Sequence, residues 1–190
     1  MADFLPAFEF MIKHEGGVLD DPNTGEISNF GITQDTLNII RYKILNPRLL
    51  TLADAQNIYY SEYWQRNSCA SINSQAVANK FFDMCVNMGS WQATRHLQAS
   101  LNSVGGSCVI DGIVGPHTII VINGFLQGTG SENRLLEELR IKCVTFYQTL
   151  GSKERYKKYL PGWLARANDI GYEVDANTLR DGSKDKTIKS

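Results

Sequence analysis

The chain has almost no excess of charge of either sign. Lys and Arg number 19 and Asp and Glu number 20, so the formal net charge of the 190 residues is −1. A protein that gathers a polyanion over a long range needs a positive field, and this composition supplies none. We therefore expect no nucleic acid among its partners.

Long hydrophobic runs are also missing. The longest apolar run, residues 119–122, is far shorter than the ~20 residues that cross a bilayer, so we expect no membrane insertion. The first ten residues contain Asp3, Pro6 and Glu9, where a secretory signal peptide has a cationic start and an unbroken apolar stretch. We expect a protein that is made in the cytoplasm without a signal peptide.

The cysteines lack the spacing of a metal site. They form no Cys-x-x-Cys pair, and no cysteine or carboxylate lies at ligand spacing from the three histidines, so we expect no metal and no cofactor. Buried free thiols are the expected state, although four cysteines allow three disulfide pairings among which the sequence does not choose. The four are Cys69, Cys85, Cys108 and Cys143.

Apolar residues are plentiful and recur at steps of three and four, which predicts a compact, mainly α-helical fold. Thr51 and Asp54 predict a capping box, Ser90 and Ser131 are predicted N-caps, and Pro116 suits a first helical turn. Segments 20–29 and 105–112 are predicted loops, and residues 173–190 a flexible tail. The predicted helices cover about residues 3–15, 33–42, 51–65, 74–88, 91–104, 116–125, 131–150, 153–159 and 162–170.

Glu15 is the acid that looks out of place. It continues the apolar face of the first predicted helix, three and four residues after Ile12 and Met11. Partial burial and the carbonyl dipoles of a helix C-terminus both disfavour an ionised carboxylate, and a general acid has to hold a proton. The alternative is a helix-terminal glutamate that accepts hydrogen bonds from the amides of residues 29–31. Position alone leaves both interpretations open.

Four groups of residues, in order along the chain, resemble the glycoside hydrolase family 108 lysozymes, or N-acetylmuramidases. The first consists of His14-Glu15-Gly16-Gly17, Asp21-Pro22 and Phe30-Gly31-Ile32-Thr33. The second is Phe82-Asp83-Met84-Cys85-Val86-Asn87-Met88-Gly89, and the third is Asp111-Gly112-Ile113-Val114-Gly115-Pro116-His117-Thr118. The fourth combines residues 140–147 with Gly162-Trp163-Leu164-Ala165-Arg166. The resemblance extends over about residues 5–170.

The resemblance implies a lysozyme-like helical fold of two closely packed lobes with a loop-rich active-site segment. Residues 1–88 would form the catalytic muramidase region, residues 89–172 a helical peptidoglycan-binding region, and residues 173–190 the tail. The implied reaction is cleavage of the β-1,4 bond between N-acetylmuramic acid and N-acetylglucosamine, with Glu15 as general acid. Asp21, at the family's Asp-Pro position, is the expected second catalytic group, with Asp20 and Glu26 as alternatives.

Several polar and aromatic residues are expected to bind the sugars. Aromatic rings stack on sugar faces, whereas amides, hydroxyls and carboxylates bond sugar hydroxyl and acetamido groups. For Asp83 the alternative is that it braces the Glu15 loop, and for the aromatic residues the alternative is packing in the core. The candidates are Ser28, Asn29, Gly31, Tyr60, Trp64, Asp83 and Asn87.

Two other activities fit the same residues: a non-catalytic peptidoglycan-binding module, and a lytic transglycosylase that releases anhydro products. The expected partner is the peptidoglycan glycan strand, recognised through the sugar cleft because no basic surface is expected. We expect a monomer that acts on the cell wall, in the periplasm or outside the cell, after release by a holin or a secretion apparatus. A phage endolysin and a secretion-associated muramidase fit the sequence equally well.

Overall fold

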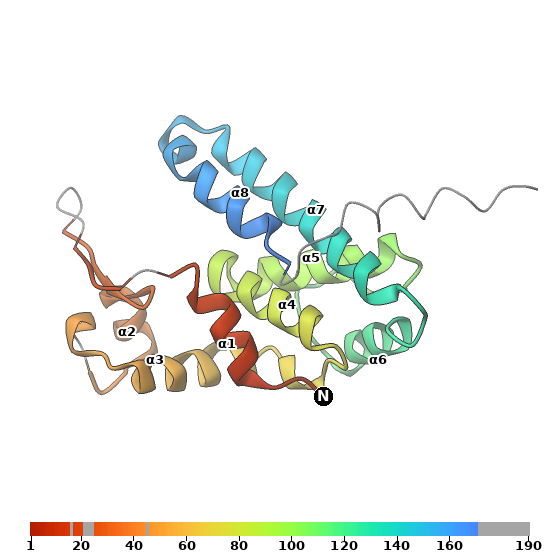
Figure 1. The fold of residues 1–190 in the computed structure, drawn as a ribbon, viewed down its shortest axis with the longest axis horizontal. Helices are drawn as coiled ribbons and strands as arrows, with labels where there is room; N and C mark the ends of the chain where they lie inside the picture. The colour runs from red at the N-terminus through yellow and green to blue at the C-terminus, as the bar shows by residue number, and fades with distance from the viewer. Residues whose placement is uncertain (16, 21–24, 45, 171–190) are drawn as a thin grey trace, which may run out of the picture.

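The computed structural model describes residues 1–15, 17–20, 25–44 and 46–170, and shows a mainly helical protein (Figure 1). The predicted fold class is confirmed. The predicted tail, residues 173–190, and the predicted catalytic Asp21 lie outside the described residues. Within the described part of the chain, no helix combines the length and the apolar character needed to cross a membrane.

Helices of several kinds make up most of the described chain. The α-helices are α1 (Phe4–Ile12), α2 (Gln34–Ile40), α3 (Leu52–Tyr59), α4 (Gln75–Met88), α5 (Ser90–Ser103), α6 (Pro116–Phe125), α7 (Ser131–Gly151) and α8 (Leu160–Asn168). The short 3₁₀ helices are η1 (Pro47–Leu49), η3 (Cys69–Ser71) and η4 (Glu154–Tyr159), and η2 (Tyr60–Gln65) is a π-helix that continues α3.

A small antiparallel sheet lies where the sequence predicts only a loop. Its strands, in the order β1 (Leu19–Asp20), β2 (Ile27–Asn29) and β3 (Ile32–Thr33), pair Leu19 with Ser28 and Asn29 with Ile32. The prediction is wrong because strands of two or three residues are too short to show alternation in the sequence. The turn between β2 and β3 has positive φ at both Phe30 and Gly31, which suits a tight hairpin.

Most predicted helix starts are confirmed. In the capping box, the Asp54 amide donates to Thr51 Oγ1 and the Thr51 amide donates to Asp54 Oδ2, each at 3.1 Å. Ser74 accepts from the amide of Val77 at the start of α4, and Pro116 is the first residue of α6. These caps are local, so short sequence patterns suffice to predict them.

Two predicted N-caps, Ser90 and Ser131, are wrong. Each serine is the first residue inside its helix, and the N-cap is the preceding glycine, Gly89 or Gly130, which has a positive φ. The Ser90 hydroxyl accepts from Asn67 at 2.9 Å, and the Ser131 hydroxyl donates to the carbonyl of Gly128 at 2.6 Å.

Helix α4 lies at the centre of the molecule and contacts α1, α5 and α7 (Figure 1). Its predicted inward face, which includes Val77, Phe81 and Met84, is buried. One hydrophobic cluster runs from Ala2 to Ala167, so the two predicted regions share a core. Cys69, Cys85 and Cys143 are buried in it, and all four cysteines are free thiols.

Helices α7 and α8 form an antiparallel pair whose connecting end, η4, projects from the body (Figure 1). The other end of α8 is attached to α4 by the buried Lys80. Its ammonium donates to the carbonyls of Arg166, Ala167 and Asp169 at 2.9, 3.1 and 2.6 Å. A cation at the carbonyl end of a helix satisfies its unpaired acceptors, so Lys80 determines where the last turn of α8 lies.

Candidate active site

Glu15 lies just beyond the first helix. Helix α1 ends at Ile12, and the amide of Glu15 donates to the Ile12 carbonyl at 3.0 Å, so the predicted helix is three residues too long. The Glu15 side chain is 16% exposed, in agreement with the predicted partial burial. It is therefore close to the surface, but most of its contacts are with protein atoms.

The partner of Glu15 comes from the other end of the chain. Arg166 of α8 places Nη1 2.6 Å from Glu15 Oε1, although the two residues are 151 positions apart. The Nε of the same guanidinium donates to Oδ1 of Asp83, on α4, at 2.9 Å. Arg166 and Asp83 are both buried, so one arginine joins a surface carboxylate to a core carboxylate.

The electrostatics of this triad depend on burial and on close opposite charges. Burial by itself would lower the pKa of Arg166, but the carboxylates of Asp83 and Glu15 outweigh it and raise this pKa. Burial raises the pKa of Asp83, and the guanidinium opposes that rise. The guanidinium of Arg166 bonds the Glu15 carboxyl directly, and the sequence-based argument about helix dipoles does not include this contact.

The turn between β2 and β3 packs directly against the Glu15 carboxyl. Gly31 has φ +75°, and a Cβ at this position would overlap the Glu15 carboxyl group and lie 3.1 Å from Tyr59 Oη. Tyr59 Oη in turn donates to the carbonyl of Phe30 at 2.8 Å. The absence of a side chain at Gly31 therefore allows the turn, Tyr59 and Glu15 to come together.

Two of the predicted sugar-binding residues are in the small sheet. Asn29 is buried, and its Nδ2 donates to the carbonyl of Leu50 at 3.2 Å, so the side chain connects the sheet to η1 and does not face a sugar. Ser28 is half-buried in β2, between Leu19 of β1 and Thr33 of β3.

The aromatic residues near Glu15 are not the two that were predicted. Trp64 is only 2% exposed and packs against Phe4 and Phe82, so it belongs to the core and its predicted sugar contact is wrong. Tyr60 is 42% exposed, but its ring contacts Phe4 at 5.1 Å, at the opposite end of α1 from Glu15. The nine residues of α1 separate these ends by about 13 Å.

Tyr59 and Tyr63 are instead on the Glu15 side of the α3–η2 helix. Their ring centroids are 5.7 Å apart. Burial raises the pKa of Tyr59 and of Tyr63, and the negative charge of Glu15 adds to both effects. Tyr59 is buried and Tyr63 is half-buried, so Tyr63 has the more accessible ring.

The remaining two predicted residues, Asp83 and Asn87, are both on α4. Asp83 is buried against Arg166, so the alternative interpretation, bracing of Glu15, replaces direct contact with sugar. Asn87, one turn along α4, is half-buried and donates to Tyr147 Oη at 2.6 Å. Both side chains thus connect α4 to the α7–α8 pair.

Of the candidates for the second catalytic group, Asp20 is the last residue of β1 and Glu26 directly precedes β2. Asp21 is outside the described residues. Asp20 is exposed and forms an ion pair with Arg48, and Glu26 is exposed at the start of β2.

Sequence reasoning missed Arg166 and Lys80 as site residues. Arg166 is the last residue of the fourth group of residues that carries the family resemblance, and Lys80 is the one cation on a largely apolar predicted helix. A charged residue in an apolar segment indicates that it has a buried partner. Nothing in the order of the residues indicates that this partner is Glu15.

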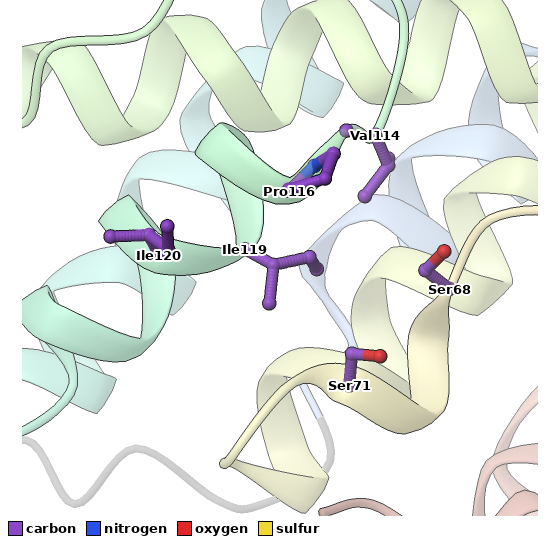
Figure 2. A pocket seen from close by; sticks show the side chains of 7 residues that line it. Ser68, Ser71, Val114, Pro116, Ile119 and Ile120 are labelled. Carbon is purple, nitrogen blue, oxygen red and sulfur yellow. The ribbon is translucent and has the colours of Figure 1, made fainter.

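A separate depression of about 360 Å³ lies between η3 and the start of α6 (Figure 2). Figure 2 shows Ser68 and Ser71 on one side of it and the apolar side chains of Val114 and Ile119 on the other. Its lining includes no titratable group, so acid–base chemistry belongs to the Glu15 site. Among the described residues, no three His, Cys, Asp or Glu side chains gather as a metal ion would require.

The chain is similar to known proteins in its sequence and in its fold. Residues 8–89 match the family described as Glycosyl hydrolase 108, and residues 92–168 match the one described as Predicted Peptidoglycan domain. The fold is similar to the structure of SagA from Brucella abortus, with a TM-score of 0.71 and 22% sequence identity over 88% of this chain and 90% of that chain. A comparison with curated proteins gives no match.

The first family match ends at Gly89, between α4 and α5, and the second begins at Gln92, so the Glu15–Arg166 pair takes one residue from each. The combination identifies a glycoside hydrolase that acts on peptidoglycan. The chain therefore belongs to the glycosyl hydrolase 108 family through residues 8–89, and it carries a predicted peptidoglycan domain in residues 92–168.

Proposed function

We propose that the protein is an N-acetylmuramidase in which Glu15 is the general acid. The bond cleaved is the β-1,4 linkage between N-acetylmuramic acid and N-acetylglucosamine. The observation that carries the proposal is the Glu15 carboxyl itself, partly exposed and held through Oε1 by Arg166 at 2.6 Å. The second oxygen, Oε2, lies against the turn at Gly31, which comes this close because it has no side chain.

The two oxygens of Glu15 have different tasks in this proposal. Oε1 accepts a hydrogen bond from Arg166 in either protonation state, so the proton of the acid form resides on Oε2. In the reaction this proton passes to the glycosidic oxygen as the bond from that oxygen to the anomeric carbon breaks. A water molecule then bonds to the anomeric carbon and passes a proton to the second catalytic carboxylate, which leaves a hydrated reducing end, and exchange with solvent returns the proton to Glu15.

Arg166 assists the reaction through the charge that develops on Glu15. The acid becomes a carboxylate as it gives up its proton, and a guanidinium already in hydrogen-bond contact stabilises that negative charge without reorganisation. The bond from Arg166 to buried Asp83 keeps the guanidinium in place. Arg166 is thus a positioning and electrostatic residue supplied by the second family region.

We assign the activation of water, or stabilisation of the positive sugar, to Asp21, with Asp20 and Glu26 as the alternatives. Tyr63 is the aromatic ring best placed to line the sugar site, since it is half-buried and on the Glu15 side. Ser28 remains a candidate to bond the substrate or its water from the neighbouring strand.

The test compares Glu15→Gln with the native protein on purified peptidoglycan, with products identified by mass. We expect the native protein to release muropeptides with a hydrated reducing end, and Glu15→Gln to keep its fold but lose turnover. Glu9→Gln, which changes an exposed glutamate on the same helix, is the matched control and should retain activity. Substantial turnover by Glu15→Gln would refute the assignment.

The same assay separates the other activities. Anhydro products from the native protein would identify a lytic transglycosylase, and no cleavage would identify a binding module. We further propose a monomer that acts on the wall in the periplasm or outside the cell and depends on a holin or a secretion apparatus to reach it. Size-exclusion chromatography and wall lysis with and without such a release system test these two points.

A further inference from the structure

The end of the α7–α8 pair concentrates positive charge in a protein that has no net excess of it. Residues 153–159, here called the basic tip, contain four cations and one acid. Their net charge is +3 while that of the whole chain is −1, so the rest of the chain carries −4. All four cations are exposed: Lys153, Arg155, Lys157 and Lys158.

Aromatic rings hold part of this charge in place. The guanidinium of Arg155 lies 4.5 Å from the ring centre of Tyr156, and the ammonium of Lys158 lies 4.8 Å from that of Tyr159. The Tyr159 ring stacks on Trp163 at 5.7 Å, and Trp163 stacks on Tyr147 at 5.4 Å. Cations over stacked rings lose less freedom on binding an anion than free lysine side chains would.

The basic tip is connected to the active site by a single short helix. Helix α8 begins at Leu160, directly after the tip, and Arg166 follows six residues later, about 9 Å along the helix axis. Helix α8 therefore has the cations at one end and the partner of Glu15 at the other. In Figure 1 the tip is the free end of the α7–α8 pair, with no other described segment covering it.

We propose that the basic tip binds the free carboxylates of the stem peptides on the glycan strand that is being cleaved. This inference rests on the proposed function, because a strand held at Glu15 continues past the site and brings its peptides along. Those peptides carry carboxylates at intervals along the strand, which complement four exposed cations beside the site. The protein therefore prefers strands with charged peptides to bare or neutralised glycan.

The net charge of the whole chain gives no indication of this basic surface, because the charges of the other residues offset it. Composition predicts recognition by the sugar cleft alone, but the folding of α7 onto α8 collects cations at one end. Exposed charge pairs are screened over about 8–10 Å in physiological salt, so the tip acts on groups close to it and does not attract distant polymers.

The experiment measures binding and cleavage on two forms of the same strands. One form is native, and in the other the peptide carboxylates are converted to amides, which removes charge but keeps glycan and peptide. The tip variant is Lys157→Gln/Lys158→Gln. The control, Lys43→Gln/Arg66→Gln, removes two exposed cations outside the tip. Binding is measured in the full chain that carries Glu15→Gln, so that the strands stay intact.

We expect the tip variant to bind native strands about three- to tenfold more weakly than its parent, as for the loss of two exposed charge pairs. Its binding to amidated strands should not change, and the control should match the parent on both. When Glu15 is left unchanged and the protein is active, the kcat/KM of the tip variant should fall by the same factor, on native strands only. Added salt should weaken native-strand binding of the parent more than that of the tip variant.

An equal loss on both strand forms, or no loss on either, would overturn the inference. These outcomes are distinct from failure of the proposed function, which is lack of cleavage by the native protein on any strand. A tip-dependent preference in the binding measurement without any cleavage would support carboxylate recognition by a non-catalytic protein.

Discussion

Replacing Arg166 with leucine tests whether the Glu15–Arg166–Asp83 triad operates as one electrostatic unit. Leucine removes the guanidinium and leaves the carboxylate of Asp83, of which 3% is exposed, without its hydrogen-bonded cation. Loss of one partner from a buried ion pair costs about 3–5 kcal/mol. A domain has only about 5–15 kcal/mol of total stability, so this loss is a large part of it. The ammonium of Lys80 partly compensates Asp83, which places the expected loss near the lower value.

The double variant Asp83→Leu/Arg166→Leu separates stability from function. With both charges replaced by apolar side chains, neither member of the ion pair is left without its partner, and the buried Lys80 ammonium keeps its three carbonyl acceptors, so we expect most of the lost stability to return. Glu15 is 16% exposed and keeps access to water. Catalysis should not return, because the cation that stabilises the Glu15 carboxylate is still absent.

The assay combines denaturant unfolding with muropeptide release for the native protein, the two single variants and the double variant. We expect a coupling free energy of about 2–3 kcal/mol from the four unfolding measurements, within the range seen for contacting residues. Additive losses, or a loss below about 1 kcal/mol for Arg166→Leu, would refute the reasoning, since a buried unpaired carboxylate costs more than that. Full activity in the double variant would refute the catalytic part.

Other changes test the supports of the site. Lys80→Met removes the ammonium that donates to the carbonyls at the end of α8, and methionine cannot replace those hydrogen bonds. We therefore expect a loss of about 1.5–3 kcal/mol in unfolding free energy and a lower kcat. Gly31→Ala forces the turn away from Glu15 and strains a residue at positive φ, so unfolding free energy should fall by about 1–2 kcal/mol and kcat by about 100-fold. Burial, and then the charges of Lys142 and Arg95, lower the pKa of His96. The unfolded chain therefore binds more protons as the pH falls below about 6.5, unfolding free energy should decrease there, and His96→Gln should reduce that decrease in acid titrations.

Local patterns predicted the helices well because helix starts depend on neighbouring residues. Thr51 and Asp54 exchange hydrogen bonds across three residues, and the buried face of α4 follows from its apolar spacing. The same rule failed for Ser90 and Ser131, since a preceding glycine at positive φ began each helix one residue earlier. Short strands such as β1 also escaped prediction because their pairing is not local.

The candidate site was predictable only in part. Glu15 was found from its place on an apolar helix face and from the resemblance, and its partial burial agrees with that prediction. The choice among the aromatic residues was wrong for Trp64, because consecutive residues on a helix point in different directions and the core determines which is covered. Tyr59 instead meets the Gly31 turn beside Glu15, and the ring of Tyr63, one turn further along, packs against Tyr59.

The sequence by itself determined the helical fold class and the family, and it singled out Glu15 as the acid that we propose, since each of these depends on residue type and short spacing. The tertiary structure alone decided which cation meets Glu15, which acid braces that cation, and where the positive charge gathers. These are contacts between segments as far apart as residues 15 and 166, and they form because α8 returns along α7 and is attached to α4 by Lys80. No local pattern encodes the direction of that return, so the charges that act together in this protein become visible only when the helices are packed.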